Sequence, residues 1–282
     1  TIQISAAQDV QLGELGDIAS VNGAISITAD ANAGSNGGAV VMADDASISS
    51  GTGEIEITAD GNITLSSVST ASSSANAVAL TTSNGSVTDA GDSNVDVIAN
   101  GGGLVIDSAM GVGDGNAVEV SVALLKVQNT TAGAIHMAES DDVDIEHLEQ
   151  LGAGDILFDS VAGTVTLLGG GGGVTGNDDV RLAALVKDVV INADVVSETG
   201  NLTVDADNDL SVNAAVATGG LGTIYLRSGN NTNLDSQLAS ASGDILVDSA
   251  ANLTQTDSIT STSGDVGLIA GGTLTQTASG DV

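Results

Sequence analysis

The sequence predicts an all-β fold, a right-handed parallel β-helix (β-solenoid) with three short strands in each coil of about 21 residues. Three observations favour this fold. A glycine-led phrase recurs along the chain, apolar and polar residues alternate inside each phrase, and the 41% of hydrophobic residues include one Phe, one Tyr and no Trp. A repeat of fixed period that buries one face of each strand is typical of coils stacked on one another.

The repeated phrase reads Gly, any residue, apolar, any residue, apolar, and then a small or polar residue. It begins at Gly23, Gly53, Gly103, Gly133, Gly154, Gly200, Gly222, Gly243 and Gly264, and starts again at Gly280. Copies from Gly200 to Gly264 follow one another at 22, 21 and 21 residues, whereas Gly23 and Gly53 are 30 apart. We therefore expect longer or irregular coils in the N-terminal half.

The phrase itself predicts the first strand of each coil. Ile55 and Ile57 alternate with Glu54 and Glu56, which is the pattern of a strand buried on one face. Two further strands are predicted after the phrase, in the stretches 62–65, 209–212, 252–256 and 273–277, and then 258–260 or 214–218. Gly, Asn, Asp and Ser between them favour turns. Paired Asn-Gly signals for hairpins are scarce, so we expect parallel stacking.

The predicted interior is narrow. Almost all apolar residues are Ala, Val, Ile and Leu, which suit a core of repeated small or branched side chains. Pro is absent, as expected where every strand donates ladder hydrogen bonds to its neighbours. We expect residues 1–282 to form a single continuous β-solenoid segment.

The middle of the chain, residues 104–191, predicts less regular coils. Residues 114–128 are expected to continue as strands, with Val118, Val120, Val122 and Leu124 pointing inward. Residues 176–190 fit either strands or a short helix that begins after an Asn or Asp cap.

The charge of the chain narrows the choice of partners. The formal net charge is −33, from 37 acidic and four basic residues, and the mean hydropathy is +0.27. Nucleic acid and anionic membranes are poor partners because their binding needs Lys and Arg. A chain this apolar is expected to fold rather than to stay disordered. Cysteine is absent, which excludes disulfides and thiolate metal sites, and no apolar run of about 18 residues predicts membrane insertion.

One stretch, residues 107–140, is similar to a block found in giant secreted bacterial adhesins related to filamentous haemagglutinin. In that family an apolar strand, a Gly-rich turn, a middle strand, an "NTT" turn and another glycine-led strand follow one another. AVEVSVALL (117–125) and QNTTAGAIHM (128–137) match it here, without the proline usual before the middle strand. The resemblance implies an extracellular β-solenoid shaft that acts in cell adhesion, biofilm or filament formation.

Three functions are therefore weighed. The leading hypothesis is a structural segment of a long extracellular bacterial fibre. The second is a stalk that presents a toxin or receptor-binding tip. The third is a polysaccharide-active β-helix enzyme, which would need clustered carboxylates, a nearby cation and aromatic platforms for sugar rings. Arg181 and Arg227 offer the guanidinium groups and Tyr225 the one exposed aromatic candidate, so we expect no catalysis.

Metal candidates are few, and no cofactor is expected beyond loosely bound Ca²⁺. Asp205, Asp207 and Asp209 alternate as at the start of an EF-hand loop, but Leu210 replaces the required Gly and no Glu follows at the twelfth position. Asp142 and Asp144 lie near His147 in an acidic stretch, which we interpret as a solvated edge. These aspartates are weak Ca²⁺ candidates. His136, between Ile135 and Met137, should point outward.

Three further expectations concern the chain's surroundings. The chain opens and closes inside a coil, which predicts adjoining coils of the same long polypeptide. The high acidic charge leads to the hypothesis that divalent cations bridge neighbouring rods. Asn-x-Ser/Thr sequons, among them those at Asn62, Asn129, Asn201 and Asn252, are expected to mark left-handed turn positions rather than glycosylation sites.

Overall fold

A computed structural model describes residues 1–30, 37–91, 94–277 and 282. These residues form strands and turns and no helix, and the strands stack as a parallel β-solenoid of about 12 turns with roughly 22 residues per turn. The predicted fold class is therefore confirmed. The chain divides into two compact units, Thr1–Ser140 and Asp141–Val282, called unit 1 and unit 2 below. The phrase that restarts at Gly280 lies outside the described residues.

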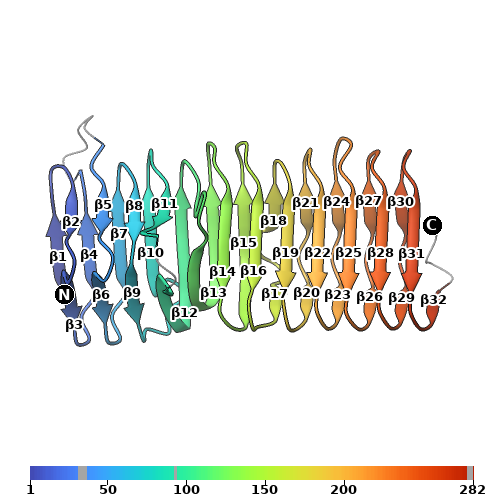
Figure 1. Ribbon diagram of the computed structural model, residues 1–282, viewed down its shortest axis with the longest axis horizontal. Coiled ribbons are helices and arrows are strands. Elements are labelled where there is room, and N and C mark those ends of the chain that lie inside the picture. The colour runs from blue at the N-terminus through green and yellow to red at the C-terminus, as the bar shows by residue number, and fades with distance from the viewer. Residues whose placement is uncertain (31–36, 92–93, 278–281) are drawn as a thin grey trace. The chain divides into compact units, whose positions relative to one another are not determined.

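Unit 1 is built from three parallel ladders (Figure 1). The first contains β1 (Ile2–Ser5), β4 (Ile25–Thr28), β7 (Ile55–Ala59), β10 (Val78–Thr82) and the second halves of β12 (Val97–Ser108) and β13 (Val118–Asn129). The second contains β2 (Val10–Leu12), β5 (Val40–Met42), β8 (Ile63–Leu65) and β11 (Val87–Asp89). The third contains β3 (Asp17–Ser20), β6 (Ser47–Ser50), β9 (Ser67–Thr70) and the first halves of β12 and β13.

Unit 2 repeats the three-ladder plan with shorter turns. Its first ladder contains β16 (Ile156–Ser160), β19 (Val180–Ala184), β22 (Leu202–Ala206), β25 (Ile224–Ser228), β28 (Ile245–Ser249) and β31 (Val266–Ala270). The second contains the start of β15 (Val143–Gln150), β17 (Val165–Leu167), β20 (Val189–Ile191), β23 (Leu210–Val212), β26 (Thr232–Leu234), β29 (Leu253–Gln255) and β32 (Leu274–Gln276). The third contains the end of β15, β18 (Gly173–Gly176), β21 (Val195–Ser197), β24 (Val216–Thr218), β27 (Leu238–Ser240) and β30 (Ile259–Ser261).

The interior of each unit consists of columns of aliphatic side chains. In unit 1, Ile25, Ile55 and Val78 occupy equivalent positions on successive coils and are buried. Each such side chain contributes about 1.5–3 kcal/mol when it leaves water. The one phenylalanine of the sequence, Phe158, is fully buried in unit 2 opposite Leu182. The narrow interior predicted from composition is thus confirmed.

Residues 176–190 adopt strands β19 and β20, so the helical alternative is wrong. Val180 and Leu182 point inward and pair with Ile156 and Phe158 on the preceding coil. This spacing of two residues leaves Arg181 on the outer side. A helix in the same place would leave the hydrogen-bonding groups of both neighbouring strands unpaired.

The inward positions of β13 match the prediction at Val118, Val120 and Val122 but not at Leu124. Leu124 is only half-buried, and Leu125 points inward in its place. The register between β12 and β13 shifts where Ala99 and Gly103 face Val122 and Leu124. The strand turns there from the third ladder to the first, and an irregularity of this kind reverses the alternation.

The phrase at Gly133 lies in a different ladder from the other phrases of unit 1. Its strand, β14 (Ile135–Glu139), pairs with Val112 and with the first residues of β13. The phrase strand that follows Gly103 instead pairs with the second half of β13, at Leu125 to Asn129. The phrase therefore marks an inward-facing strand after a turn, not one fixed face of the solenoid.

The asparagine side chains of the sequons serve the stacking of coils. Among the described residues other than Gly, positive φ occurs at Leu15, Asp30 and Asp45, so the predicted left-handed conformation at the sequon asparagines is wrong. In unit 2, the Asn252 amide oxygen accepts a hydrogen bond from the backbone N–H of Thr273 at 3.0 Å. Asn231 in turn accepts one from the Asn252 N–H at 3.3 Å. These side chains satisfy turn N–H groups that would otherwise need water.

The leading glycine of the phrase is required by close backbone contact. A Cβ atom on Gly53 would lie 2.5 Å from the carbonyl carbon and oxygen of Gly23 on the preceding coil. The N–H of Gly53 donates to Ser50 Oγ at 3.0 Å, and its carbonyl accepts from Thr70 Oγ1 at 2.7 Å. Ser50 before the turn and Thr70 on the next coil thus hold the glycine, while the neighbouring backbone excludes any side chain.

We expect Gly53→Ala to lower the free energy of unfolding by more than about 2 kcal/mol, because backbone atoms must separate to admit the methyl group. Gly101→Ala is the control, since a Cβ there meets no atom within 4 Å. Urea unfolding followed by circular dichroism measures both variants. Equal stability of the two would contradict the assigned role of Gly53.

We expect Asn231→Ala to destabilise the protein by about 1 kcal/mol, since the half-buried Asn231 side chain loses its bonds to Asn252 and to Asp209. Gln237→Ala, at an exposed turn position of the same coil, should leave the unfolding midpoint unchanged. The comparison uses thermal unfolding at equal ionic strength. If the unfolding midpoint of Asn231→Ala matched that of Gln237→Ala, the hydrogen bonds of Asn231 to neighbouring coils would not contribute to stability.

Candidate functional site

The three alternating aspartates of the predicted loop do not converge. Asp205 lies on β22, where both its carboxylate oxygens accept from Arg227 at 3.1 Å. Asp207 is exposed in the following turn. Asp209 Oδ1 accepts from Asn230 at 2.8 Å and from the N–H of Asn231 at 2.9 Å. Asp205 and Asp209 thus serve separate coil-to-coil contacts, and Asp207 faces solvent.

The second set of acidic candidates, Asp142 and Asp144, lies at the start of β15, and the nearby His147 lies in the next ladder. Asp142 Oδ1 accepts from the N–H of Thr164 at 2.8 Å and from Lys187 Nζ at 2.9 Å. The Thr164 N–H and then Lys187 lower the pKa of Asp142. Asp144 is exposed on the part of β15 that pairs with β17, whereas His147 belongs to the part that pairs with β18. The strand therefore does not bring Asp144 and His147 onto one face.

His136 points outward as predicted. Its neighbours Ile135 and Met137 are fully buried, and the histidine between them is half-exposed.

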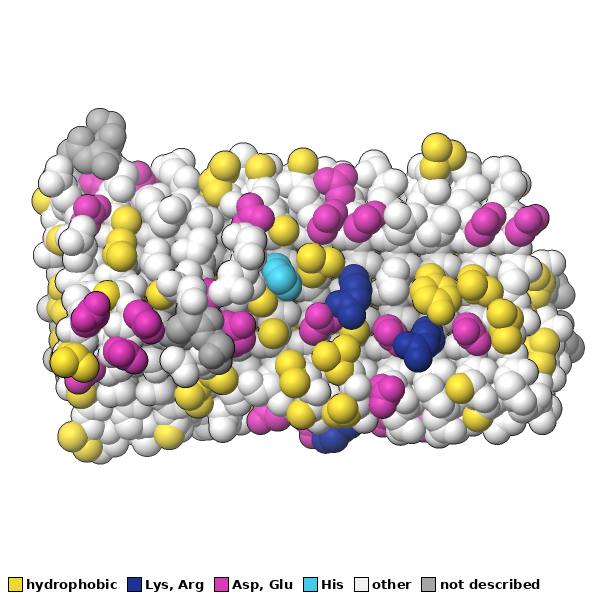
Figure 2. All heavy atoms as spheres, in the orientation of Figure 1, with side chains coloured by type: hydrophobic (Ala, Val, Ile, Leu, Met, Phe, Trp, Pro, Cys, Tyr) yellow, Lys and Arg dark blue, Asp and Glu magenta, His cyan; other side chains and the backbone are white. Residues whose placement is uncertain are grey.

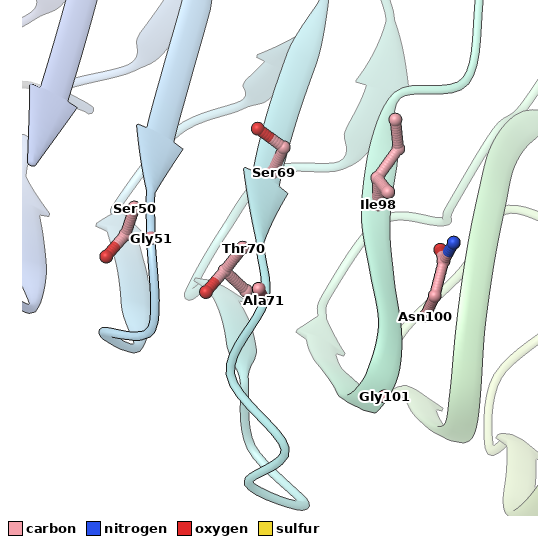
Figure 3. Close-up of a pocket in the computed structure, with 8 residues that line it drawn as sticks. All are labelled: Ser50, Gly51, Ser69, Thr70, Ala71, Ile98, Asn100 and Gly101. Atoms are coloured by element: carbon pink, nitrogen blue, oxygen red, sulfur yellow. The ribbon is translucent and has the colours of Figure 1, made fainter. Parts of the chain in front are cut away.

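An open groove in unit 1 lies along the third ladder and has a volume of about 440 Å³ (Figure 3). Ser50, Thr70, Ile98 and Asn100 line it together with neighbouring small residues, and none of its lining residues is charged. Asn100 Oδ1 accepts from Ser121 Oγ at 2.8 Å, and the Thr70 hydroxyl donates to the Gly53 carbonyl. Polar groups of the groove are therefore used to hold the coils together.

A cluster of three carboxylates in unit 1 was not predicted from the sequence. It consists of Asp89, Asp96 and Glu119, and we call it the carboxylate cluster. One oxygen of each side chain lies within 4.8 Å of the other two. It is the one group of three or more His, Asp or Glu side chains with metal-ligand spacing in the described part of the chain.

The backbone of two successive coils positions the cluster. Asp89 ends β11, Asp96 comes directly before β12, and Glu119 is the second residue of β13. The N–H of Asp96 donates to the Glu119 carbonyl at 2.8 Å, and the N–H of Val68 donates to the Asp96 carbonyl at 2.7 Å. Asp96 is thus held between the coil before it and the coil after it. Glu119 points away from the lumen because Val118 and Val120 point into it.

Asp96 is fully buried, with 0% of its surface exposed. Its Oδ2 accepts from the N–H of Glu119 at 2.9 Å, whereas its Oδ1 is buried without a hydrogen-bond partner. The pKa of Asp96 is raised to about 8, mainly by burial and also by the negative charges of Asp89 and Glu119. The hydrogen bond from the Glu119 N–H acts in the opposite direction and lowers the pKa. An unsatisfied buried carboxylate oxygen is costly, so this atom calls for an explanation.

Asp89 is held by two donors outside the cluster. Its Oδ1 accepts from the N–H of Gly91 at 2.9 Å, and its Oδ2 accepts from the Asn116 side-chain amide. Both Asp89 and Glu119 are half-buried. Arg181, Lys187 and Arg227, by contrast, form ion pairs with carboxylates of unit 2.

Sequence reasoning missed the cluster because its members are brought together only by the register of irregular coils. Asp89 and Glu119 are 30 residues apart, and the phrase spacing does not align them. One signal was available: an acidic residue, Asp96, directly precedes the inward Val97 of a strand. A carboxylate beside a strand start is too common to identify a site alone.

Comparison with known proteins returned no matching family model, no matching curated protein and no matching solved structure. Among the described residues, no helix has the length and apolar character needed to cross a membrane.

The raised pKa of Asp96 predicts that the free energy of unfolding depends on pH when divalent cations are absent. Because the folded-state pKa is raised from 3.8 to about 8, the folded protein holds a proton that the unfolded chain releases. The contribution of Asp96 to the free energy of unfolding is fully present below about pH 4. It is lost as the pH rises from about 4 to about 8.

Asp96→Asn removes this titration, so its free energy of unfolding should fall less than that of the wild type over the same pH range. Urea unfolding in chelator, repeated across the range, measures the difference. Parallel curves for the two proteins would show that Asp96 titrates normally.

Proposed function

We propose that this chain is part of the structural shaft of a very large extracellular bacterial adhesin or surface fibre. The observation that carries the proposal is the constant register of the coils. In unit 2 Leu202, Ile224, Ile245 and Val266 follow one another in a single column of the first ladder. Coils that repeat in this way can be added along one axis without a new core, which is what a shaft needs.

The similarity of residues 107–140 to adhesins related to filamentous haemagglutinin supports the same proposal. The segment corresponding to the middle strand is β13, the "NTT" turn is 129–131, and the glycine-led strand is β14. The order of strand, turn and strand therefore agrees with the family's block. We therefore propose, together with the shaft function, that the chain is extracellular and acts in cell attachment or biofilm formation.

The acidic surface supports a shaft that stays dissolved and apart from its neighbours. Figure 2 shows Asp and Glu side chains spread over the viewed face and few Lys or Arg among them. With a net charge of −33, molecules repel one another at low salt. Divalent cations that bridge neighbouring molecules would reverse this repulsion, and lateral association through them is part of the proposal.

A stalk with a toxin or receptor-binding tip would use the same coils, so the two functions differ in what the fibre carries.

A polysaccharide-active enzyme is less well supported. Arg227 is paired with Asp205, and Tyr225 lies half-buried on the first ladder of unit 2. Incubation with a panel of polyuronates in Ca²⁺ should release no unsaturated product, and cleavage would favour the enzyme.

Antibodies raised against the whole 282-residue chain test the shaft proposal. We expect immunogold labelling of unpermeabilised producing cells to follow surface fibres along their length. Label that stops short of a distinct fibre tip would favour the stalk. Label found only after permeabilisation would contradict the proposal.

A further inference from the structure

We infer that Asp89, Asp96 and Glu119 form a specific site for one Ca²⁺ ion in unit 1, with the ion joining two successive coils. The proposed site differs from the loose binding by surface carboxylates that the sequence suggested, and it does not depend on the proposed function. It rests on the convergence of the three side chains and on the state of the buried Asp96.

The spacing of the carboxylates suits a single cation. Oxygen ligands lie about 2.3–2.6 Å from Ca²⁺, so two ligands of one ion are at most about 5 Å apart. One oxygen from each member of the carboxylate cluster meets this limit, since all three lie within 4.8 Å of one another. Asp89 comes from the end of one strand, Asp96 from the start of the next, and Glu119 from the following coil.

Asp96 supplies the second, independent observation. The side chain is fully buried, and its Oδ1 has no hydrogen-bond partner. Such an atom is expected to be satisfied by something that binds it, because an uncompensated buried carboxylate is strongly unfavourable. A cation provides that partner and neutralises the charge that Asp89 and Glu119 add nearby. The raised pKa of Asp96 reports the same unfavourable field in the absence of an ion.

The donor set selects the kind of metal. Three carboxylates with no His among them are hard oxygen ligands, which favour Ca²⁺, Mg²⁺ or Mn²⁺ over Zn²⁺ or Cu²⁺. Mg²⁺ demands near-ideal octahedral geometry, whereas Ca²⁺ accepts irregular coordination and completes its shell with water. Asp89 and Glu119 are half-buried, so the site lies close enough to solvent for water to complete the shell.

The site has a defined structural consequence. It lies beside the coils whose register shifts between β12 and β13, where regular pairing is interrupted. An ion held by Asp89 and Asp96 of one coil and by Glu119 of the next would fix that irregular pair of coils. Ca²⁺ should therefore stabilise unit 1 by mass action, because the unfolded chain has no such site.

Calorimetric titration of Ca²⁺ into the chelator-treated whole chain, at about 0.15 M KCl to screen diffuse binding, tests the inference. We expect one saturable site in the wild type. Asp96→Asn should weaken it at least tenfold and Glu119→Gln should weaken it measurably. Glu56→Gln is the matched control, because it removes one exposed charge from β7 of the same unit and should leave the site unchanged.

Thermal unfolding and sedimentation velocity complete the test. Ca²⁺ should raise the unfolding midpoint of the wild type and of Glu56→Gln but not that of Asp96→Asn. The measurements use a protein concentration low enough for sedimentation velocity to show monomers, so that lateral association through Ca²⁺ does not contribute to the midpoint. Asn is nearly isosteric with Asp and can still accept from the Glu119 N–H. Circular dichroism should therefore show a folded variant, and Glu119→Gln provides a second reading.

Two outcomes would overturn the inference. One is the absence of saturable Ca²⁺ binding in the wild type, in which case a proton on Asp96 satisfies the cluster. The other is equal binding by Asp96→Asn and Glu56→Gln, which would assign the ion to other carboxylates. Neither outcome bears on the labelling of cell-surface fibres, so this site and the proposed shaft succeed or fail separately.

Discussion

The parallel backbone hydrogen bonds between successive coils set the positions of the turns and of the inward side chains in both units. In unit 1 the N–H of Ile25 donates to the backbone carbonyl of Glu54, and the N–H of Ile55 donates to that of Ala77. In unit 2 the N–H of Leu202 donates to the backbone carbonyl of Thr223 in the same way. Because each coil must lie one strand spacing from the next, its turns come into backbone contact and require glycine at positions such as Gly53. The same spacing makes inward side chains stack on one another, so branched aliphatic residues fill the lumen.

This constraint explains which parts of the fold the sequence predicts well. Alternation and a constant period identified the strands of unit 2 at 209–212 and 252–256, where β23 and β29 lie. Two coils were not recognised as phrases because Asn76 and Asp178 replace the leading glycine before β10 and β19. Both replacements stand in turns whose geometry accepts a short polar side chain, and a search for glycine alone passes over them.

Other errors came from corners, where a chain leaves one ladder and enters another. Leu124 follows an unbroken alternation from Val118, yet the strand turns between them and Leu125 becomes the inward residue. The carboxylate cluster was missed for a related reason. Local spacing groups Asp205, Asp207 and Asp209, yet Asp205 and Asp209 bind different partners on the next coil and Asp207 is exposed. It cannot group Asp96 with Glu119, because their proximity depends on how two irregular coils are aligned.

The direction of the coil-to-coil hydrogen bonds gives either unit a particular response to force. These bonds run along the direction in which coils are stacked, so tension along that direction acts on the interfaces between coils in series, and the weakest interface separates first. A unit under tension would unwind turn by turn, and each released turn of roughly 22 residues would add up to about 70 Å of extended chain. Such a chain would lengthen in steps and absorb sudden loads, and the irregular coils around β12 and β13 are where the steps would differ.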